Sequence, residues 1–322
     1  MKAWALLATA LFLTAVTSPV SANDYPDRTV TLVVPFSPGS AADNSMRVFT
    51  RILSQKLGQT VVIDNKPGAG GIIGMEYGAN SKPDGYTLIF GSSGPMATYV
   101  SLYKTLSYDP VKSFKLVRVG AANPYVMVAN PSRPYKTLAE FIDYARKNPD
   151  KINYGSPGSG TSNHLAAEML QSMTGIKLTH VPYKSSTAQQ ADLLAGVLDV
   201  SFEFPSGSRA NIEAGRLIPL AMASEKRMAN FPNVPTFAEL GYPDMKIAAW
   251  SSFVLPAGTP EPIVKKLDAA IAETLKDKAM TDYYAIGDSL VMDIGPDKYP
   301  EFLASEIARL KIVIERSGAK AN

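Results

Sequence analysis

The stretch Thr31–Arg47 constrains the fold more than any other part of the sequence. The apolar run Val30–Val34 favours a β-strand that is buried on both faces. After a glycine turn at Gly39, apolar residues recur at helical spacing as far as a helix stop at Gly58. Such a turn leaves backbone N–H groups at the helix start unpaired, where the helix dipole favours negative charge. The stretch therefore predicts an anion site, although an ordinary capped connection also explains it.

Residues 1–22 are typical of a secretory signal peptide. Lys2 precedes an apolar segment from Ala3 to Val16, and small residues lead up to a cleavage site predicted after Ala22. The apolar segment is shorter than the ~20 residues needed to span a bilayer. We therefore expect a mature protein that begins at Asn23 and lies in the periplasm.

The composition excludes several kinds of site. The sequence has no cysteine and two histidines, which excludes disulfides and thiolate chemistry and makes a poor metal site. Lysines and arginines are scattered and the formal net charge is +3, which argues against a nucleic-acid surface. We expect neither a metal nor a cofactor. A length of 322 residues favours two domains.

The pattern of strand, glycine turn and helix recurs along the chain. A strand at residues 60–64 leads into a glycine turn at 67–74, and a strand at 152–154 leads into the turn Gly155–Ser162 and a helix that ends at Gly175. The glycine spacing at 68–74 is a variant of the dinucleotide-binding pattern, but the next strand lacks the acidic residue that would hold a ribose. Close backbone packing is the better explanation of that turn.

The recurring units predict an α/β fold with mostly parallel sheets flanked by helices. Thr137–Glu140 is a capping box, and Thr259 with Pro260 is expected to open a late helix as N-cap and first residue. A last helix is expected over Tyr299–Arg316. Open α/β sheets bind ligands outside the carboxyl ends of their strands, so two facing domains would bring the glycine turns to one cleft.

Several motifs in order resemble the Bug family, the periplasmic solute-binding proteins of tripartite tricarboxylate transporters. The first matches are Tyr25–Arg28, Val34–Asp43, Asn65–Gly71 and Lys82–Leu88. The later matches are Ser156–Leu165, His180–Lys184, Asp192–Leu194, Val234–Glu239 and Pro256–Pro260. Together they cover nearly the whole of the expected mature chain.

The resemblance implies a type II periplasmic binding protein with a ligand cleft flanked by hinge strands. Residues 23–122 and 249–322 would form one domain, and residues 123–248 the other. The protein would close over a small organic carboxylate and deliver it to the integral-membrane permease subunits of a tripartite tricarboxylate transporter. We expect a monomer that binds no nucleic acid.

The resemblance also implies which residues contact the ligand, mainly through backbone N–H groups of two turns. The first turn would contribute Phe36, Ser37, Gly39, Ser40, Ala41 and Ala42, and the second Ser156, Gly158, Ser159, Gly160, Thr161 and Ser162. Further expected contacts are Asp43, Ser92, His164, Tyr183, Lys184, Ser185 and Glu203. Two of these have structural alternatives. Asp43 forms a capping box with Ser40, and His164 is placed to bond backbone groups beside the second turn.

The sequence differs from the usual family motifs in the turns expected to contact the distal end of the ligand. Ser40, Ser185 and Ala188 replace residues usual in the family, and Glu203 replaces an aspartate. If Glu203 reaches the cleft, it disfavours a second ligand carboxylate and favours a monocarboxylate or a neutral or aromatic far end. The position of Lys184 leaves this ligand preference open, because Lys184 could pair with Glu203, face the ligand or lie in solvent.

Serines in glycine turns and two histidines leave one alternative function, an exported α/β hydrolase or isomerase acting on a small carboxylate. The spacing argues against it, because the sequence has no Gly-x-Ser-x-Gly elbow. We therefore expect a binding protein and not an enzyme.

Overall fold

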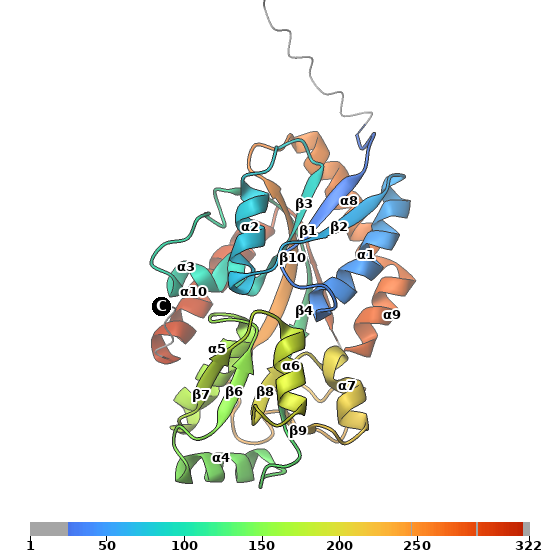
Figure 1. Ribbon diagram of the computed structural model, residues 1–322. Helices are drawn as coiled ribbons and strands as arrows, with labels where there is room; N and C mark the ends of the chain where they lie inside the picture. The colour runs from blue at the N-terminus through green and yellow to red at the C-terminus, as the bar shows by residue number, and fades with distance from the viewer. Residues whose placement is uncertain (1–24, 246, 288, 318–322) are drawn as a thin grey trace, which may run out of the picture.

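The computed structural model describes residues 25–245, 247–287 and 289–317. The predicted signal peptide, residues 1–22, lies outside the described residues. Figure 1 shows an upper part, coloured blue, cyan, orange and red, and a lower part, coloured green and yellow, each built on a β-sheet flanked by helices. No helix in the described part of the chain is long and apolar enough to cross a membrane.

The upper sheet has the strand order β11-β4-β10-β3-β1-β2. Strand β1 is parallel to β2 and β3, whereas β10 is antiparallel to β3 and β4, and β11 is antiparallel to β4. The strands are β1 (Val30–Val34), β2 (Val61–Asn65), β3 (Thr87–Ser92), β4 (Phe114–Pro124), β10 (Ala248–Pro256) and β11 (Leu290–Ile294). The helices are α1 (Ala41–Leu57), α2 (Ile72–Ala79), α3 (Tyr99–Leu102), α8 (Glu261–Lys276), α9 (Lys278–Ile286) and α10 (Tyr299–Ser317). A 3₁₀ turn, η1 (Ala69–Gly71), precedes α2, and a π-helix, η2 (Gly94–Thr98), precedes α3.

The lower sheet has the strand order β7-β6-β8-β5-β9. Strand β6 is parallel to β7 and β8, and β5 is antiparallel to β8 and β9. The strands are β5 (Val126–Ala129), β6 (Asn153–Ser156), β7 (Thr179–Pro182), β8 (Val200–Glu203) and β9 (Ile218–Met222). The helices are α4 (Leu138–Lys147), α5 (Ser162–Thr174), α6 (Ser186–Leu194) and α7 (Pro205–Glu213).

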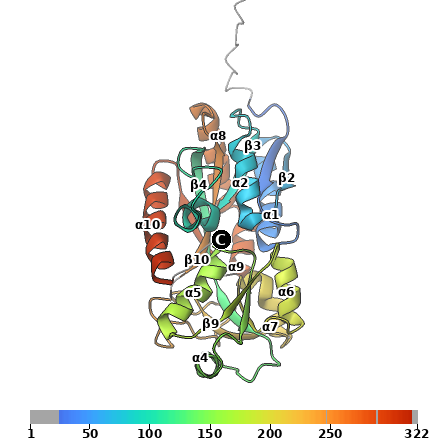
Figure 2. The same ribbon diagram turned by 60° about the vertical axis from the view of Figure 1, so that its left-hand side comes forward.

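Strand β1 is buried on both faces, as its apolar run predicts. Leu32 belongs to a cluster with Phe49 of α1 and Leu267 of α8, whereas Val33 belongs to a second cluster with Met75 of α2. Helices cover both faces of the upper sheet, and the turn after β1 is therefore held between two packed layers (Figure 2).

The structure confirms most of the expected helix starts and ends. Gly58 and Gly175 adopt left-handed φ values of +68° and +70° at the ends of α1 and α5. The capping box of α4 is formed by Thr137 and Glu140. The expected start of α8 is wrong by one residue, because Pro260 is the N-cap and the Thr259 hydroxyl instead donates to the carbonyl of Pro256.

Both sheets are mixed rather than mostly parallel, because β5 is antiparallel to its neighbours in the lower sheet and β4 and β10 are antiparallel to theirs in the upper sheet. Strand β4, which the sequence analysis did not predict, runs from the upper sheet towards β5 of the lower sheet, and β10 brings the chain back. A strand that leaves and a strand that returns must run in opposite directions, so the two pair antiparallel, with Ala248 opposite Pro124 and Trp250 opposite Ala122. These two strands connect the upper and lower parts.

Candidate functional site

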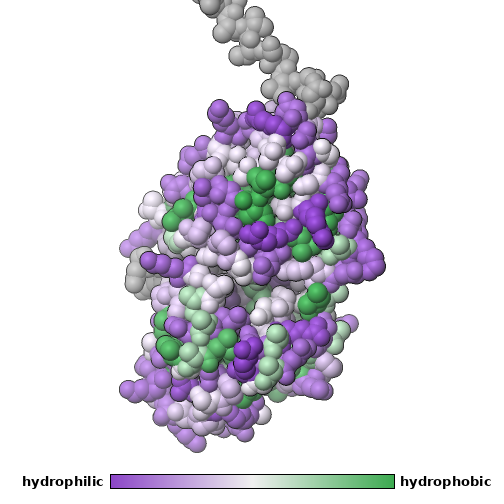
Figure 3. Space-filling view, turned by 45° about the vertical axis from the view of Figure 1, so that its right-hand side comes forward, coloured by the Kyte–Doolittle hydropathy of each residue, from purple (hydrophilic) through white to green (hydrophobic). Residues whose placement is uncertain are grey.

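A cavity of about 110 Å³ lies between the upper and lower parts. Figure 3 shows a hollow at the waist of the molecule, between the upper and lower halves. The walls come from the turn after β1, the end of β3, strand β10 and helix α9 above, and from the first residues of α5, α6 and α7 below. The carboxyl ends of β1, β3 and β6 therefore meet at one cavity, as the sequence predicts.

Two helix N-termini face this cavity. Ala41 and Ala42 are the first residues of α1, Ser162 and Asn163 are the first residues of α5, and all four line the cavity. Within the described residues, no hydrogen bond uses the backbone N–H of any of these four. Unpaired N–H groups and the positive ends of two helix dipoles thus point to the same space.

The described lining of the cavity is uncharged. Among the described lining residues there is no Asp, Glu, Lys, Arg or His. Seven aromatic side chains contribute instead: Phe36, Phe90, Tyr125, Phe204, Trp250, Tyr283 and Tyr284. An anion in this cavity would be held by backbone N–H and hydroxyl groups and not by an ion pair, and its carbon skeleton would lie against aromatic rings.

The first turn is supported from behind by Asp43, which is fully buried. Its carboxylate accepts hydrogen bonds from Gly39 N (2.9 Å), Arg47 Nε (2.8 Å) and Asn65 Nδ2 (3.0 Å). Burial alone would raise the pKa of Asp43, but these hydrogen bonds hold that pKa below its ordinary value. Asp43 is therefore a charged support of the turn.

The capping box predicted for α1 is only half formed. The Ser40 hydroxyl accepts the N–H of Asp43 (3.2 Å), as expected for an N-cap. The carboxylate of Asp43, however, bonds Gly39 N rather than Ser40 N, because the N–H of Ser40 donates to the carbonyl of Ser37.

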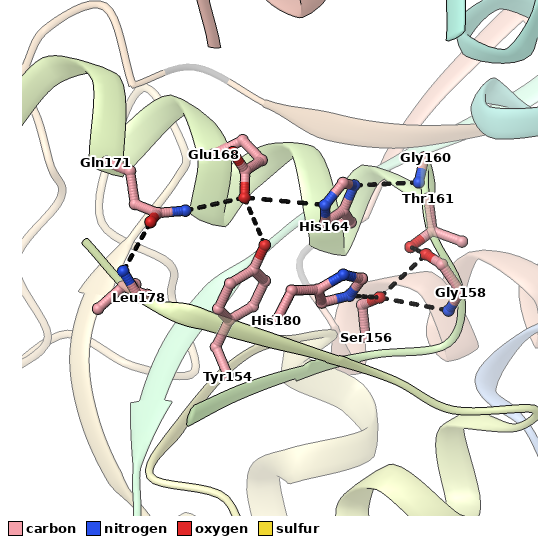
Figure 4. Close-up of polar contacts among 10 residues, drawn as sticks. All are labelled: Tyr154, Ser156, Gly158, Gly160, Thr161, His164, Glu168, Gln171, Leu178 and His180. Atoms are coloured by element: carbon pink, nitrogen blue, oxygen red, sulfur yellow. Dashed lines mark hydrogen bonds and ion pairs between the residues drawn. The ribbon is translucent and has the colours of Figure 1, made fainter. Parts of the chain in front are cut away.

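The second turn uses its glycine N–H groups internally. Gly160 N donates to His164 Nδ1 (3.0 Å), and Gly158 N donates to the hydroxyl of Ser156 (3.3 Å), as drawn in Figure 4. The left-handed φ values of Gly158 and Gly160, +135° and +79°, allow the chain to make this turn. The free N–H groups accordingly belong to Ser162 and Asn163 rather than to the glycines.

The second turn packs closely against the upper part. A Cβ on Gly158 would lie 3.3 Å from the Cα of Gly70, and a Cβ on Gly160 would lie 2.0 Å from Leu102 Cδ2. The hydroxyl oxygens of Ser93, at the end of β3, and Ser162 are 2.8 Å apart. The cleft is therefore closed in this structure.

The residues expected from the sequence occupy three positions relative to the cavity. Those that line it are Phe36, Ser40, Ala41, Ala42, Ser92, Thr161 and Ser162. A smaller adjoining pocket is bordered by Ser37, Lys184 and Ser185. The remaining expected residues line neither space: Gly39, Asp43, Ser156, Gly158, Ser159, Gly160, His164, Tyr183 and Glu203. Direct contact of any of them with a ligand stays a prediction.

Glu203 lies beneath α6 instead of in the cavity. Its Oε1 accepts hydrogen bonds from Gln189 Nε2 (2.5 Å) and Ser201 Oγ (2.6 Å), and burial raises its pKa to about 7. It forms no ion pair with Lys184 among the described residues. Glu203 nevertheless lies close enough to raise the pKa of Tyr125, which lines the cavity, so its expected effect on a second ligand carboxylate stays a prediction.

Sequence analysis missed most of the aromatic wall. Tyr125 stacks on Phe204 with ring centroids 4.8 Å apart, and Trp250 joins them from the returning strand β10. These residues come from separate elements, so no local pattern unites them. The adjacent pair Tyr283 and Tyr284 was the one visible indication.

A serine–histidine pair bears on the enzymatic alternative. Ser156 Oγ and His180 Nε2 are 2.7 Å apart, within reach for a nucleophile and a base. Ser156 is nevertheless fully buried and does not line the cavity, so a substrate there would not meet it. The described residues also contain no cluster of three or more His, Cys, Asp or Glu that could hold a metal.

The fold and the closed cavity between two lobes define a periplasmic solute-binding protein. The chain belongs to the tripartite tricarboxylate transporter family receptor (TctC) family, whose family model matches residues 45–319. The family expected from the sequence is therefore confirmed.

Individual relatives match over most of the chain. BugT of Bordetella pertussis is 36% identical over 306 residues, which are 95% of this chain and 94% of BugT. A solved R. palustris structure with adipate has 36% sequence identity and a TM-score of 0.88, covering 92% of this chain and 99% of that chain. MatC from Rhodopseudomonas palustris, solved with bound malate, has 31% sequence identity and a TM-score of 0.85, covering 90% of this chain and 100% of that chain.

Proposed function

We propose that the protein captures a small organic carboxylate in the cavity between its two parts and delivers it to the membrane permease subunits of a tripartite tricarboxylate-type transporter. The observation that carries the proposal is the meeting of two helix N-termini, at Ala41–Ala42 and Ser162–Asn163, on a cavity whose described lining residues include no charged side chain. One ligand carboxylate would accept hydrogen bonds from these four N–H groups.

The aromatic wall supports a ligand whose carbon skeleton is at least partly apolar. Tyr125, Phe204, Trp250 and Tyr283 line the same cavity as the helix starts and would give such a skeleton apolar surface to pack on. Ser186 and Ser206, near the starts of α6 and α7, offer hydroxyl groups to a polar far end. Two structural neighbours were solved with adipate and with malate, which are both dicarboxylates. We therefore include dicarboxylates among the candidate ligands.

A thermal-shift screen tests the ligand class. The compounds are adipate, malate, succinate, citrate, glutamate, nicotinate and benzoate, with the corresponding amides and alcohols as controls. An acid at 100 times its Kd stabilises the folded protein by roughly 2.7 kcal/mol, a readable shift. Native mass spectrometry of each positive mixture should show one unchanged acid per chain. Stabilisation by the amides as strongly as by the acids would contradict the proposed anion site.

We also propose export to the periplasm with cleavage after Ala22, and a monomeric mature protein. The charged start followed by an apolar segment supports export. N-terminal sequencing of the protein from a periplasmic extract should begin at Asn23, and recovery of an intact Met1 from the cytoplasm would contradict it.

The proposed domains are residues 23–122 with 249–322, and residues 123–248. The membership of the two sheets supports this division, because β1–β4, β10 and β11 form one sheet and β5–β9 form the other. The proposed boundaries fall in the strands that connect the sheets, where a change of angle would open the cavity.

A further inference from the structure

The two turns that border the cavity are closed by the same kind of bond. In the first turn Gly39 N donates to Asp43 Oδ2 (2.9 Å), and in the second turn Gly160 N donates to His164 Nδ1 (3.0 Å). Each acceptor lies four residues after its glycine, at the third position of the helix that follows. The two glycines also share their backbone conformation, with φ values of +77° and +79°.

We propose that His164 is a positioning residue whose Nδ1 holds the second turn in the shape that directs the N–H groups of Ser162 and Asn163 into the cavity. The inference rests on the proposed function in that it assigns a role within the same site. The bond itself can be measured without any ligand.

The turn has little freedom to compensate for the loss of this bond. Its glycine packs against α3 so tightly that a Cβ on Gly160 would lie 2.9 Å from Tyr99 Cε1 and closer still to Leu102. The N–H of Gly160 is buried together with its imidazole acceptor. Without that acceptor, the N–H would be left unpaired away from water unless the turn moved.

The two supports differ in charge. Asp43 is an anion whose carboxylate is paired with Arg47, whereas the second support is an imidazole. Since His164 Nδ1 accepts the Gly160 N–H, the ring proton must lie on Nε2, which faces the carboxylate of Glu168 at 3.7 Å. The start of α5 would receive a ligand carboxylate, and an unpaired anion beside it would repel that ligand. A neutral ring closes the turn without placing such an anion there.

A second imidazole keeps this ring in place. His180 of β7 stacks on His164 with centroids 4.2 Å apart, and Tyr154 of β6 stacks on His180 at 4.9 Å (Figure 4). His180 Nε2 bonds the hydroxyl of Ser156 at the start of the same turn. The two rings therefore support the turn at both ends.

The surroundings favour the neutral form of both rings. Burial and the neighbouring His180 lower the pKa of His164 to about 3, and burial lowers the pKa of His180 to about 4. The titratable groups facing the rings are Glu168 on α5 and Tyr154 on β6, which are hydrogen-bonded to each other (2.5 Å), and Tyr99 packs on the turn from α3. His164 Nδ1 is therefore available as an acceptor at neutral pH.

The first experiment reads the imidazoles directly. The sequence contains two histidines, and both belong to this cluster, so ¹⁵N side-chain NMR of the protein yields two assignable rings. His164 should be neutral with its proton on Nε2 from pH 7 down to pH 5. A proton on Nδ1, or titration near the ordinary histidine pKa of about 6.5, would overturn the proposal.

The second experiment compares His164→Asn with His164→Leu. The side-chain oxygen of asparagine can take the place of Nδ1, whereas leucine fills space without an acceptor. We expect the Gly160 amide to exchange with solvent roughly fivefold to tenfold faster in His164→Leu than in wild type, and at nearly the wild-type rate in His164→Asn. Equal acceleration in both variants would overturn the proposal, because ring packing and not the acceptor would then hold the turn.

Adipate calorimetry links the bond to binding. Its Kd should be close to wild type in His164→Asn and several-fold weaker in His164→Leu. A Kd unchanged in His164→Leu would overturn the positioning role. If the wild-type protein fails to bind adipate, an acid selected by the thermal-shift screen takes its place, and if no acid binds, the proposed function fails while the tautomer and exchange measurements still decide this proposal. If His164→Leu does not fold, the tautomer of His164 in the wild-type protein decides the proposal.

Discussion

A Gly160→Ala substitution tests whether the second turn must approach α3 closely. Gly160 has a left-handed φ of +79°, and a Cβ there would lie 2.0 Å from Leu102 Cδ2 and 2.9 Å from Tyr99 Cε1. Alanine in the left-handed region costs about 1–2 kcal/mol. Forcing a methyl group into filled space costs about 1–3 kcal/mol more.

The two penalties should appear in different measurements. The conformational penalty is present whether the cleft is open or closed, so it lowers the free energy of unfolding. The clash involves Leu102 and Tyr99 of the upper part, so opening the cleft relieves it. Its free-energy penalty therefore weakens ligand binding, which requires the closed cleft, and does not lower the free energy of unfolding. A loss of about 1–3 kcal/mol in binding free energy corresponds to a Kd that is roughly 5-fold to 150-fold weaker.

Gly175→Ala is the matched control. Gly175 has a φ of +70°, and a Cβ there would meet nothing within 4 Å. Urea unfolding should show both variants destabilised to a similar extent. Calorimetry with an acid selected by the thermal-shift screen should show a weaker Kd in Gly160→Ala alone. Equal Kd values in the two variants would refute the reasoning that closure requires this close approach.

Three further predictions concern buried charge and the aromatic wall. The pKa of Glu203 is raised to about 7, so the stability that its neutral form contributes is fully present below the ordinary pKa of 4.5 and is lost as the pH rises through 7. Glu203→Gln should therefore raise the free energy of unfolding at pH 8 and change it little at pH 4. If urea unfolding shows the same effect at both pH values, Glu203 is not buried in this way. Asp43 has a lowered pKa, so its contribution is present above its ordinary pKa of 3.8 and is lost as the pH falls through the lowered value. Asp43→Ala should therefore cost roughly 1.5–3 kcal/mol at pH 7 and much less in strong acid, and an equal cost at both pH values would show that its charge is irrelevant. Trp4 lies in the predicted signal peptide, so Trp250 is the remaining tryptophan of the expected mature chain and its fluorescence should respond to a bound acid; a saturating acid that leaves the emission unchanged would place the ligand away from this wall.

The elements that could be predicted from the sequence are those whose structure is determined by residues close together in the chain. The strand Val30–Val34, the turn at Gly39 and the stop at Gly58 were predicted because apolar periodicity, a serine cap and a left-handed glycine lie within thirty consecutive residues. The rule that open α/β sheets bind ligands outside the carboxyl ends of their strands supplied the next step, that two such turns meet at one cavity. Six of the seven cavity-lining residues that were expected lie at these two turns.

Sequence reasoning failed where the determinants are distant. Strand β4 has no clear alternation, because one of its ends belongs to the upper sheet and the other leads towards the lower sheet. Glu203 does not line the cavity, and strand parity alone could not say which face of β8 is covered by α6. Gln189, its hydrogen-bond partner, comes from a helix fourteen residues earlier.

The pairing of β4 with β10 has a consequence for how a ligand closes the molecule. The connecting segments hydrogen-bond to each other, with Ala249 opposite Asn123 and a shift of register between Trp250 and Ser252. A two-stranded ribbon bends readily across its plane and resists shear and independent rotation of its strands. We therefore expect the two lobes to move as the jaws of a clip with a single bending axis. A ligand that bridges the jaws would restrict one soft motion instead of several, so the small carboxylate proposed as the ligand would need few contacts to hold the molecule shut.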